Sequence, residues 1–265
     1  MPTSNKNYIK NLPLGGDRGG PLPLGGDRGG PLPLGGLGGL TICACASRTF
    51  IDKDKVASIA AAAKKAGMKV ELVGDLCELC ETKDKKVGEI AQTTIIACHT
   101  RAVKSLIAFA AGQASENSQY IDLRSQSVEE VLSSLGIDAT DDADAEEWRQ
   151  QIATFPKKLG EDAWYPTLDK DACAECGKCL EFCPFGVYEM VEDRIAVTHP
   201  QHCKNNCPAC ARQCPTSAII FPKYDRSPIN GGKELQEKAI RLDSKELYGE
   251  VLRQRLIERR GSIFK

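Results

Sequence analysis

The cysteines are the residues whose type and spacing could do chemistry, and eight of the thirteen fall in the 42 residues from Cys173 to Cys214. The first four follow the pattern C-x2-C-x2-C-x3-C-P, and the second four follow C-x3-C-x2-C-x3-C-P. Cysteines with this spacing let one loop present three thiolates to three corners of an iron–sulfur cubane. The pattern therefore predicts two [4Fe–4S] clusters.

The fourth cysteine of each motif precedes a proline and is expected to ligate the cluster of the other motif. One predicted ligand set is Cys173, Cys176, Cys179 and Cys214. The other predicted set is Cys203, Cys207, Cys210 and Cys183. Gly177 has no Cβ and suits a close approach of the backbone to sulfide. The extra residue between Cys203 and Cys207 removes no ligand, but it changes the loop and therefore its hydrogen bonds to sulfur.

Zinc is the competing interpretation of these motifs, because CxxC pairs also occur in zinc ribbons and fingers. Zinc sites use separated pairs of cysteines, whereas a cysteine triplet followed by Cys-Pro is the spacing of iron–sulfur loops. The odd number of cysteines and the lack of a secretory signal disfavour a disulfide framework. Because cluster thiolates need a reducing interior, we expect a cytoplasmic location.

Residues 165–222 resemble the bacterial two-cluster ferredoxins, since they carry both motifs in order. The resemblance implies a pseudo-symmetric α+β domain in which each half supplies a strand, a cluster loop and a short helix. The expected strands are residues 165–168, 194–197 and 218–221. It also implies single-electron transfer between partner oxidoreductases, with no catalytic acid, base or nucleophile.

The segment before this region alternates between strand and helix patterns. Short apolar runs predict strands at residues 40–45, 69–73, 93–97 and 120–123. Amphipathic stretches predict helices at residues 53–66, 84–91, 101–111 and 128–135. Asp52 and Thr100 are the expected N-caps of the first and third helices. This order predicts an α/β domain with a parallel sheet over residues 39–137.

Cysteines follow three of these strands, and the carboxyl ends of parallel strands share the edge where open α/β sheets bind ligands. These five cysteines are Cys43, Cys45, Cys77, Cys80 and Cys98. Helix N-termini begin at the same edge and favour thiolates. Four thiolates hold a third [4Fe–4S] cluster or a zinc ion, and the fifth is then spare. The alternatives are a redox-active Cys77–Cys80 dithiol and buried cysteines that bind nothing.

Two segments of this domain, Cys43-Ala-Cys45 and Ala97-Cys98-His-Thr-Arg101, resemble the N-terminal iron–sulfur domain of the heterodisulfide reductase A subunit. That domain has a CxC after its first strand, a cysteine after its second, and a C-x-x-R at the start of a helix. The resemblance covers residues 38–115. A flavin-binding module follows the domain in that family, but this sequence has no strand-anchored G-x-G-x-x-G, so neither flavin nor NAD is predicted.

Two functions fit these motifs. The first is an electron-transfer protein or subunit that carries two or three [4Fe–4S] clusters and relays single electrons between partner oxidoreductases. The second is an oxidoreductase that reduces a disulfide or small molecule at the N-terminal cysteines, with His99 and Arg101 as polar groups in the crevice. A redox sensor is a third possibility, but no DNA-binding signal supports it.

The rest of the chain limits the class of protein. A net charge of -1 argues against nucleic-acid binding, and no apolar run approaches the roughly 18 residues of a membrane span. Residues 1–38 repeat LPLGGDRGGP and are expected to be disordered. Residues 138–164 are predicted to be an acidic linker that leads into a helix. Residues 223–265 form a basic tail with an expected docking helix at residues 244–260, for which partner binding is the alternative.

Overall fold

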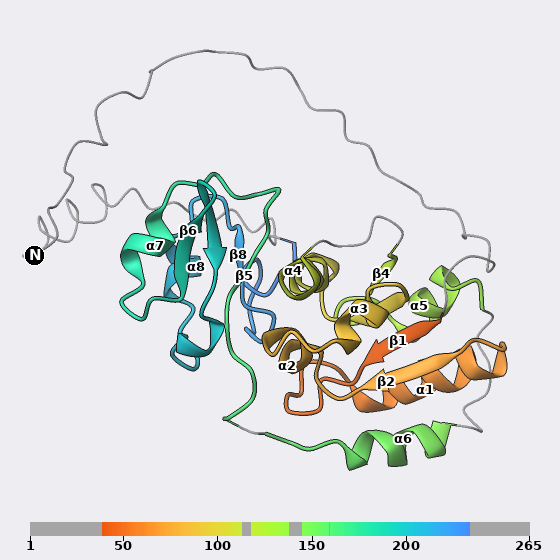
Figure 1. Cartoon of the computed structure of the whole chain (residues 1–265). Coiled ribbons are helices and arrows are strands. Elements are labelled where there is room, and N and C mark those ends of the chain that lie inside the picture. Colours follow the sequence, from red (N-terminus) through yellow and green to blue (C-terminus); the bar gives the residue numbers. More distant parts are fainter. Residues whose placement is uncertain (1–38, 113–117, 138–144, 159, 234–265) are drawn as a thin grey trace, which may run out of the picture. The chain divides into compact units, whose positions relative to one another are not determined.

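The computed structural model describes residues 39–112, 118–137, 145–158 and 160–233, all of which belong to one compact unit (Figure 1). The repeat segment at residues 1–38 and the helix expected at residues 244–260 lie outside the described residues. None of the helices in the described part of the chain has the length and apolar character needed to span a membrane.

A four-stranded parallel sheet forms the first region, as the alternating pattern predicts. Its strands are β1 (Leu40–Cys43), β2 (Val70–Val73), β3 (Thr94–Ala97) and β4 (Tyr120–Asp122), in the order β2-β1-β3-β4. Leu40 of the central strand pairs with Val70 on one side and with Thr94 on the other. The central strands are buried along their whole length, because helices cover both faces of the sheet.

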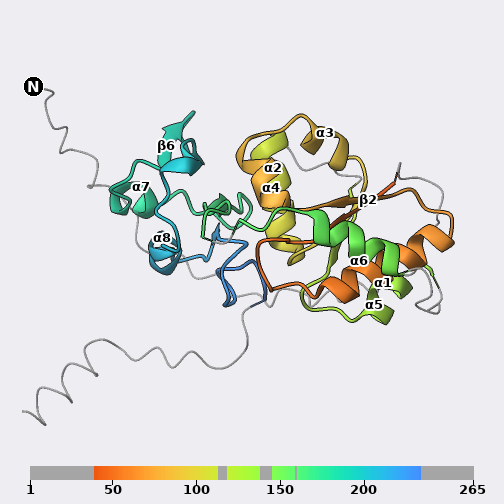
Figure 2. The same cartoon turned by 90° about the horizontal axis from the view of Figure 1, so that it is seen from below.

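Five helices pack in two layers around this sheet (Figures 1 and 2). One layer holds α1 (Lys53–Lys65) and α5 (Val128–Ser134), and the other holds α2 (Leu76–Glu81), α3 (Lys86–Ile90) and α4 (Thr100–Ala111). The side chain of Asp52 accepts a hydrogen bond from the backbone N–H of Asp54, so the predicted N-cap of α1 is confirmed. Ser127 and Glu130 form a capping box at the start of α5.

The acidic segment contains a helix, α6 (Ala145–Thr154), which packs along α1 (Figures 1 and 2). Ala145 and Ile152 are buried in this contact, and Arg149 Nε donates to Asp54 Oδ1 at 2.8 Å. The acids in the first turn of α6 predict the helix start. They do not reveal that this part of the expected linker docks on the α/β domain.

The second region repeats one arrangement of strands and helices. Strand β5 (Thr167–Leu168) pairs antiparallel with β8 (Ile219–Ile220), and β6 (Tyr188–Val191) pairs antiparallel with β7 (Arg194–Val197). Two short helices, α7 (Lys178–Phe182) and α8 (Ala209–Gln213), and the 3-10 helix η2 (Pro200–His202) complete it. The three expected strands are present, β5 and β8 being shorter than predicted, and β6 is an additional strand. Trp164 stacks on Phe221 in its core, with ring centroids 5.3 Å apart.

Three predicted boundaries near the cysteines are wrong. Strand β1 ends at Cys43, and Cys45 has a positive φ of 49° in the turn that follows. The predicted loop after β2 is the helix α2, because Asp75 accepts a hydrogen bond from Glu78 N and caps it. Helix α4 includes Thr100, and His99 occupies its N-cap position without a side-chain bond.

The segment after β8 returns to the α/β domain and packs on the start of α4. Gly231 has a φ of +88°, and a Cβ added there would lie 2.7 Å from the Cβ of Ala102. Only glycine fits this close approach. The residues after 222 therefore attach the second region to the first, although the sequence pattern of the second region stops at residue 222.

Candidate functional site

The structure brings the five N-terminal cysteines to the carboxyl edge of the parallel sheet. Cys43 ends β1, Cys45 follows it in a turn, and Cys98 follows β3. Cys77 and Cys80 lie on α2, one helical turn apart, immediately after β2. All five are buried in one hydrophobic core, and none is more than 7% exposed.

Four of these thiols influence one another. A hydrogen bond between Cys45 and Cys98 lowers the pKa of Cys45 and raises that of Cys98. Burial raises the pKa of Cys43 to about 12, and the charges of Cys45 and Asp75 add to this effect. Burial also raises the pKa of Cys77, to which Cys43 and Cys45 contribute. Backbone N–H of Leu76 donates to Cys43 Sγ at 3.5 Å.

Cys80 is the fifth thiol of this core, and its charge, like that of Cys77, adds to the effect of burial that raises the pKa of Tyr165. Cys80 is fully buried on α2, and its pKa is raised by burial, by Cys43 and by Asp75. The remaining three N-terminal cysteines interact with one another and with Cys43.

A lysine that sequence reasoning missed lies beneath the Cys43–Cys45 turn. Lys53 Nζ donates to the carbonyl oxygens of Ala44 and Cys45 at 2.6 Å each and to that of Arg48 at 2.9 Å. Burial lowers the pKa of Lys53, but the neighbouring thiols of the site oppose this. The ammonium group therefore fixes the turn and places a positive charge beside the thiols. Its position in the first turn of α1 gave no signal of this role.

The two polar residues predicted for the crevice have other partners. His99 Nδ1 lies 3.0 Å from Asp122 Oδ2 at the end of β4. Although burial opposes ionisation, hydrogen bonds from His99 and Ser125 lower the pKa of Asp122 to about 2. Arg101 donates from Nε to Asp169 Oδ2 at 2.6 Å and from Nη2 to the carbonyl of Ser217. The Arg101 side chain thus binds the second region of the chain.

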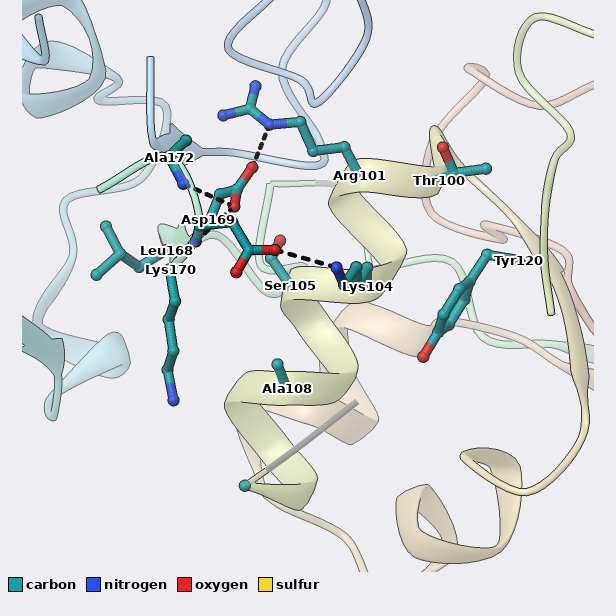
Figure 3. A pocket seen from close by; sticks show the side chains of 12 residues that line it. Thr100, Arg101, Lys104, Ser105, Ala108, Tyr120, Leu168, Asp169, Lys170 and Ala172 are labelled. Atoms are coloured by element: carbon teal, nitrogen blue, oxygen red, sulfur yellow. Dashed lines mark hydrogen bonds and ion pairs between the residues drawn. The ribbon is translucent and has the colours of Figure 1, made fainter. Parts of the chain in front are cut away.

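A cavity of about 850 Å³ adjoins these contacts, between α4 and residues 168–172 (Figure 3). Its charged lining is largely paired, since Arg101 binds Asp169 and Lys104 binds Asp171 at 3.1 Å. None of its twelve lining residues is a cysteine. The cavity is therefore separate from the N-terminal thiols.

The eight cysteines of the second region lie in two loops and at the starts and ends of α7 and α8. Cys179 and Cys210 are buried, Cys176 is exposed, and the others are intermediate. Gly177 precedes α7 with a φ of +73°, a conformation that glycine adopts without strain. These thiols therefore range from the domain core to its surface.

The thiols interact across the two motifs. Burial raises the pKa of Cys203 to about 12, with contributions from Cys210, Cys207 and Cys183. Cys214 of the second motif adds to the effect of burial on the pKa of Cys173 in the first. The fourth cysteine of each motif is thus near thiols of the other motif.

Hydrogen bonds to sulfur accompany this arrangement. Tyr188 on β6 donates from its hydroxyl to Cys210 Sγ at 3.1 Å, and backbone N–H of Ala218 donates to Cys214 Sγ at 3.3 Å. Burial favours the neutral Cys214 thiol, but hydrogen bonds from Thr216, Ala218 and Ile219 outweigh it and lower the pKa. Tyr188 was not a predicted site residue, because an aromatic residue in a short strand is an ordinary core position.

No group of three or more His, Cys, Asp or Glu side chains among the described residues is arranged to hold one metal ion. A [4Fe–4S] cluster takes one thiolate at each of four irons, which is a different geometric requirement.

Comparisons with known proteins assign the second region. Residues 165–240 match the model of the 4Fe-4S dicluster domain family. Ferredoxin-3 of a Nostoc species is 35% identical over 93 residues, a match that covers 27% of this chain and 90% of that protein. The chain belongs to the ferredoxins. Its ferredoxin domain is an iron–sulfur electron-transfer domain with [4Fe–4S] clusters.

Two further relatives support this assignment. An uncharacterized ferredoxin of Methanocaldococcus jannaschii is 42% identical over 69 residues, and the match covers 26% of this chain and 47% of that protein. The chain thus spans about half the length of this relative. Pyruvate synthase subunit PorD of Methanothermobacter marburgensis is 43% identical over 54 residues, which are 20% of this chain and 60% of that subunit. The parallel sheet of this chain lies outside the residues that the family model matches.

Proposed function

We propose that the whole chain is a cytoplasmic electron-transfer protein or subunit with three [4Fe–4S] clusters, two in the ferredoxin domain and one at the edge of the parallel sheet. It relays single electrons between partner oxidoreductases. One relative is by name a subunit of pyruvate synthase, and an enzyme that releases low-potential electrons is the class of partner that suits this chain. The observation that carries the proposal is the direct packing of the ferredoxin domain against the cysteine-bearing edge.

The ligands of the ferredoxin domain are proposed to be crossed between the motifs. One cluster is held by Cys173, Cys176, Cys179 and Cys214, and the other by Cys203, Cys207, Cys210 and Cys183. The mutual influence of Cys203, Cys210 and Cys183 supports the second set, and that of Cys173 and Cys214 supports the first. Tyr188 and the Ala218 N–H orient two of these sulfur atoms.

The third cluster is proposed to be held by Cys43, Cys45, Cys77 and Cys98, with Cys80 as the spare thiol. The charges of Cys43, Cys45 and Cys77 all raise the pKa of Cys98, which indicates that these four thiols lie close together. The same four positions fit the CxC, the following cysteine and the C-x-x-R of the heterodisulfide reductase A domain that this segment resembles. Coordination to iron deprotonates a thiol, so the raised pKa values of the free thiols are compatible with this role.

Two contacts join the proposed sites. The hydroxyl of Tyr165, which begins the ferredoxin domain, donates to the carbonyl of Cys77 at 2.7 Å. Cys203 packs against both the core of the α/β domain and that of the ferredoxin domain. The cluster that Cys203 would hold therefore borders the core of the α/β domain.

The clusters, when bound, accept and release single electrons without a proton donor or acceptor. The chain contributes the rest. Apolar burial excludes water from the N-terminal thiols, Lys53 holds the Cys43–Cys45 turn, and Tyr188 donates to a ligand sulfur. Hydrogen bonds to sulfur and solvent exposure are the means by which proteins set the potential of such clusters.

A reactive Cys77–Cys80 dithiol is the less supported alternative. Burial raises the pKa of both thiols, so the nucleophilic thiolate is scarce near neutral pH. Both side chains are also shielded from solvent.

Iron analysis of the anaerobically purified full chain tests the proposal. Three clusters require about twelve irons per chain, and two require about eight. Replacing Cys43 and Cys98 together by alanine should lower the iron content by about four and remove one EPR signal. The matched control Cys80→Ala should keep all three signals. A wild-type content of about eight irons, or loss of a cluster in the Cys80 variant alone, would contradict the proposed third site.

A further inference from the structure

A buried lysine in the segment after β8, which belongs to the ferredoxin region as the family match at residues 165–240 defines it, reaches into the N-terminal cysteine site. Lys223 follows β8, and its side chain is 3% exposed. Its Nζ lies 2.5 Å from Asp75 Oδ2 and 2.9 Å from Asp162 Oδ2. Both carboxylates are largely buried as well. Burying an ammonium group costs folding free energy unless it is paired in this way. We therefore asked what the charge of Lys223 does at this position.

The partners of Lys223 belong to the loops that carry the cysteines. Asp75 caps α2, on which Cys77 lies two residues further along. Lys223, Cys77 and Tyr165 line the same small cavity. Asp162 also accepts from Arg48 Nε at 2.8 Å, and the backbone N–H of Arg48 donates to the carbonyl of Cys45. The ion network therefore extends from the α2 loop to the turn after β1.

The charges of this network balance locally. Arg48 and Lys223 carry positive charges, and Asp75 and Asp162 carry negative ones. Lys223 Nζ lies within 2.9 Å of both carboxylates, so the ammonium group is held charged in the buried site. Asp75 caps the helix that carries Cys77, and Lys223 lines a small cavity with the same thiol. Lys223 and Asp75 thus place opposite charges near Cys77.

We propose that Lys223 is a positioning residue that the ferredoxin region supplies to the N-terminal cysteine site, where its charge offsets Asp75 and sets the potential of the bound cluster. The inference rests on the third cluster of the proposed function. Because the reduced cluster carries one more negative charge than the oxidised cluster, a buried cation nearby stabilises the reduced form. The electron affinity of the N-terminal site then depends on the docked ferredoxin region.

Opposite charge deletions test this proposal. In the full chain, Lys223→Gln should lower the potential of the N-terminal cluster, and Asp75→Asn should raise it. Each shift should reach about tenfold in the equilibrium constant for reduction, or about 59 mV for one electron. The double variant should return close to the wild-type potential. Asparagine caps helices about as well as aspartate, so Asp75→Asn changes the charge while keeping the cap.

Redox titration monitored by EPR gives these potentials and also reports the two ferredoxin clusters, which serve as internal references. Lys223→Arg keeps the charge and should restore most of the wild-type potential. Lys86→Gln is the matched control, since Lys86 forms an exposed ion pair with Glu71 on the same domain, and this change should leave all potentials unaltered.

The outcomes separate the two proposals. A wild-type iron content of about eight would overturn the third cluster and this inference with it. About twelve irons, with potentials that do not move or that move in the same direction in Lys223→Gln and Asp75→Asn, would overturn the inference alone. If the ion network has only a structural role, both Lys223→Gln and Asp75→Asn should move the potential in the same direction. If Lys223→Gln does not fold, the sign of the Asp75→Asn shift decides, and an unchanged or lowered potential is the contradicting result.

Discussion

The two cysteine sets differ in how the chain assembles them. The ferredoxin set lies within 42 consecutive residues and ranges from buried Cys179 to exposed Cys176. The N-terminal set comes from three separate segments, and all its members are buried at one sheet edge. A local loop can present thiolates by its spacing alone, whereas separated thiols meet only after the sheet has formed.

The two regions also differ in how exposed they are to solvent and to partner proteins. Among the described residues, the exposed large apolar side chains all lie in the ferredoxin domain: Phe182, Phe185, Met190 and Val191. The N-terminal thiols are buried, and Pro222 and Lys223, which follow β8, line a small cavity together with Cys77. Under the proposed function, the electron route to the N-terminal site leads through the ferredoxin domain, because Tyr165 of that domain contacts Cys77.

Core truncations should give the largest effects and show whether the two regions unfold together. Ile96→Ala in β3 should cost roughly 2–5 kcal/mol and Phe221→Ala roughly 3–5 kcal/mol, because both side chains are fully buried. Urea unfolding can be followed by circular dichroism and by the visible absorbance of the clusters. Coincident transitions in both variants are expected from the shared packing, and early loss of absorbance in Phe221→Ala alone would show independent regions.

The next largest effect concerns the attachment of the ferredoxin domain to α4. Arg101→Met removes the bonds to Asp169 and Ser217 and should cost roughly 1.5–3 kcal/mol of unfolding free energy. Lys104→Met is the matched control, because its ion pair with Asp171 is exposed and worth less than about 1 kcal/mol. Equal losses in the two variants, measured by chemical denaturation, would argue against Arg101 as the main link.

Acid should weaken the N-terminal region through Asp122. The pKa of this carboxyl is about 2 in the folded chain, below the ordinary value of about 3.9. Ionised Asp122 therefore adds about 2 kcal/mol above roughly pH 4, and this contribution is lost as the pH falls towards 2. Asp122→Asn should be less stable than wild type at pH 7, and the difference should vanish near pH 2. Exposed Asp171→Asn should show no such convergence in urea titrations.

The smallest expected effect is on one ferredoxin cluster. Tyr188→Phe removes the hydrogen bond to Cys210 Sγ and should lower the potential of that cluster by roughly 20–60 mV, the equivalent of about 0.5–1.5 kcal/mol. Tyr224→Phe is the matched control. Tyr224 packs against the same core, but its hydroxyl accepts a hydrogen bond from Arg212 instead of donating to a cysteine sulfur. An equal shift in both variants, seen by redox titration, would indicate a general packing effect.

Much of the fold follows from the sequence pattern. Strands β1 to β4 appear where apolar runs predict them, because parallel strands covered on both faces must be apolar throughout. Helix α2 was missed, because six residues are too few for a periodic pattern and its cap, Asp75, precedes them by a single position. The additional strand β6 was also missed. It is exposed along most of its length, so its sequence lacks a buried pattern.

The candidate site also has a part that the sequence indicates and a part that only the folded chain shows. Cysteine type and spacing by themselves indicate [4Fe–4S] clusters in the ferredoxin domain, since the proposed ligands follow one another along the chain. Tertiary structure alone brings Cys43, Cys77 and Cys98 together in one buried core. It also places Lys223, 146 residues after Cys77, beside that thiol. Local spacing determines which residues can bind a cluster, but charge and burial at the site depend on residues that are distant in sequence and adjacent only in the folded chain.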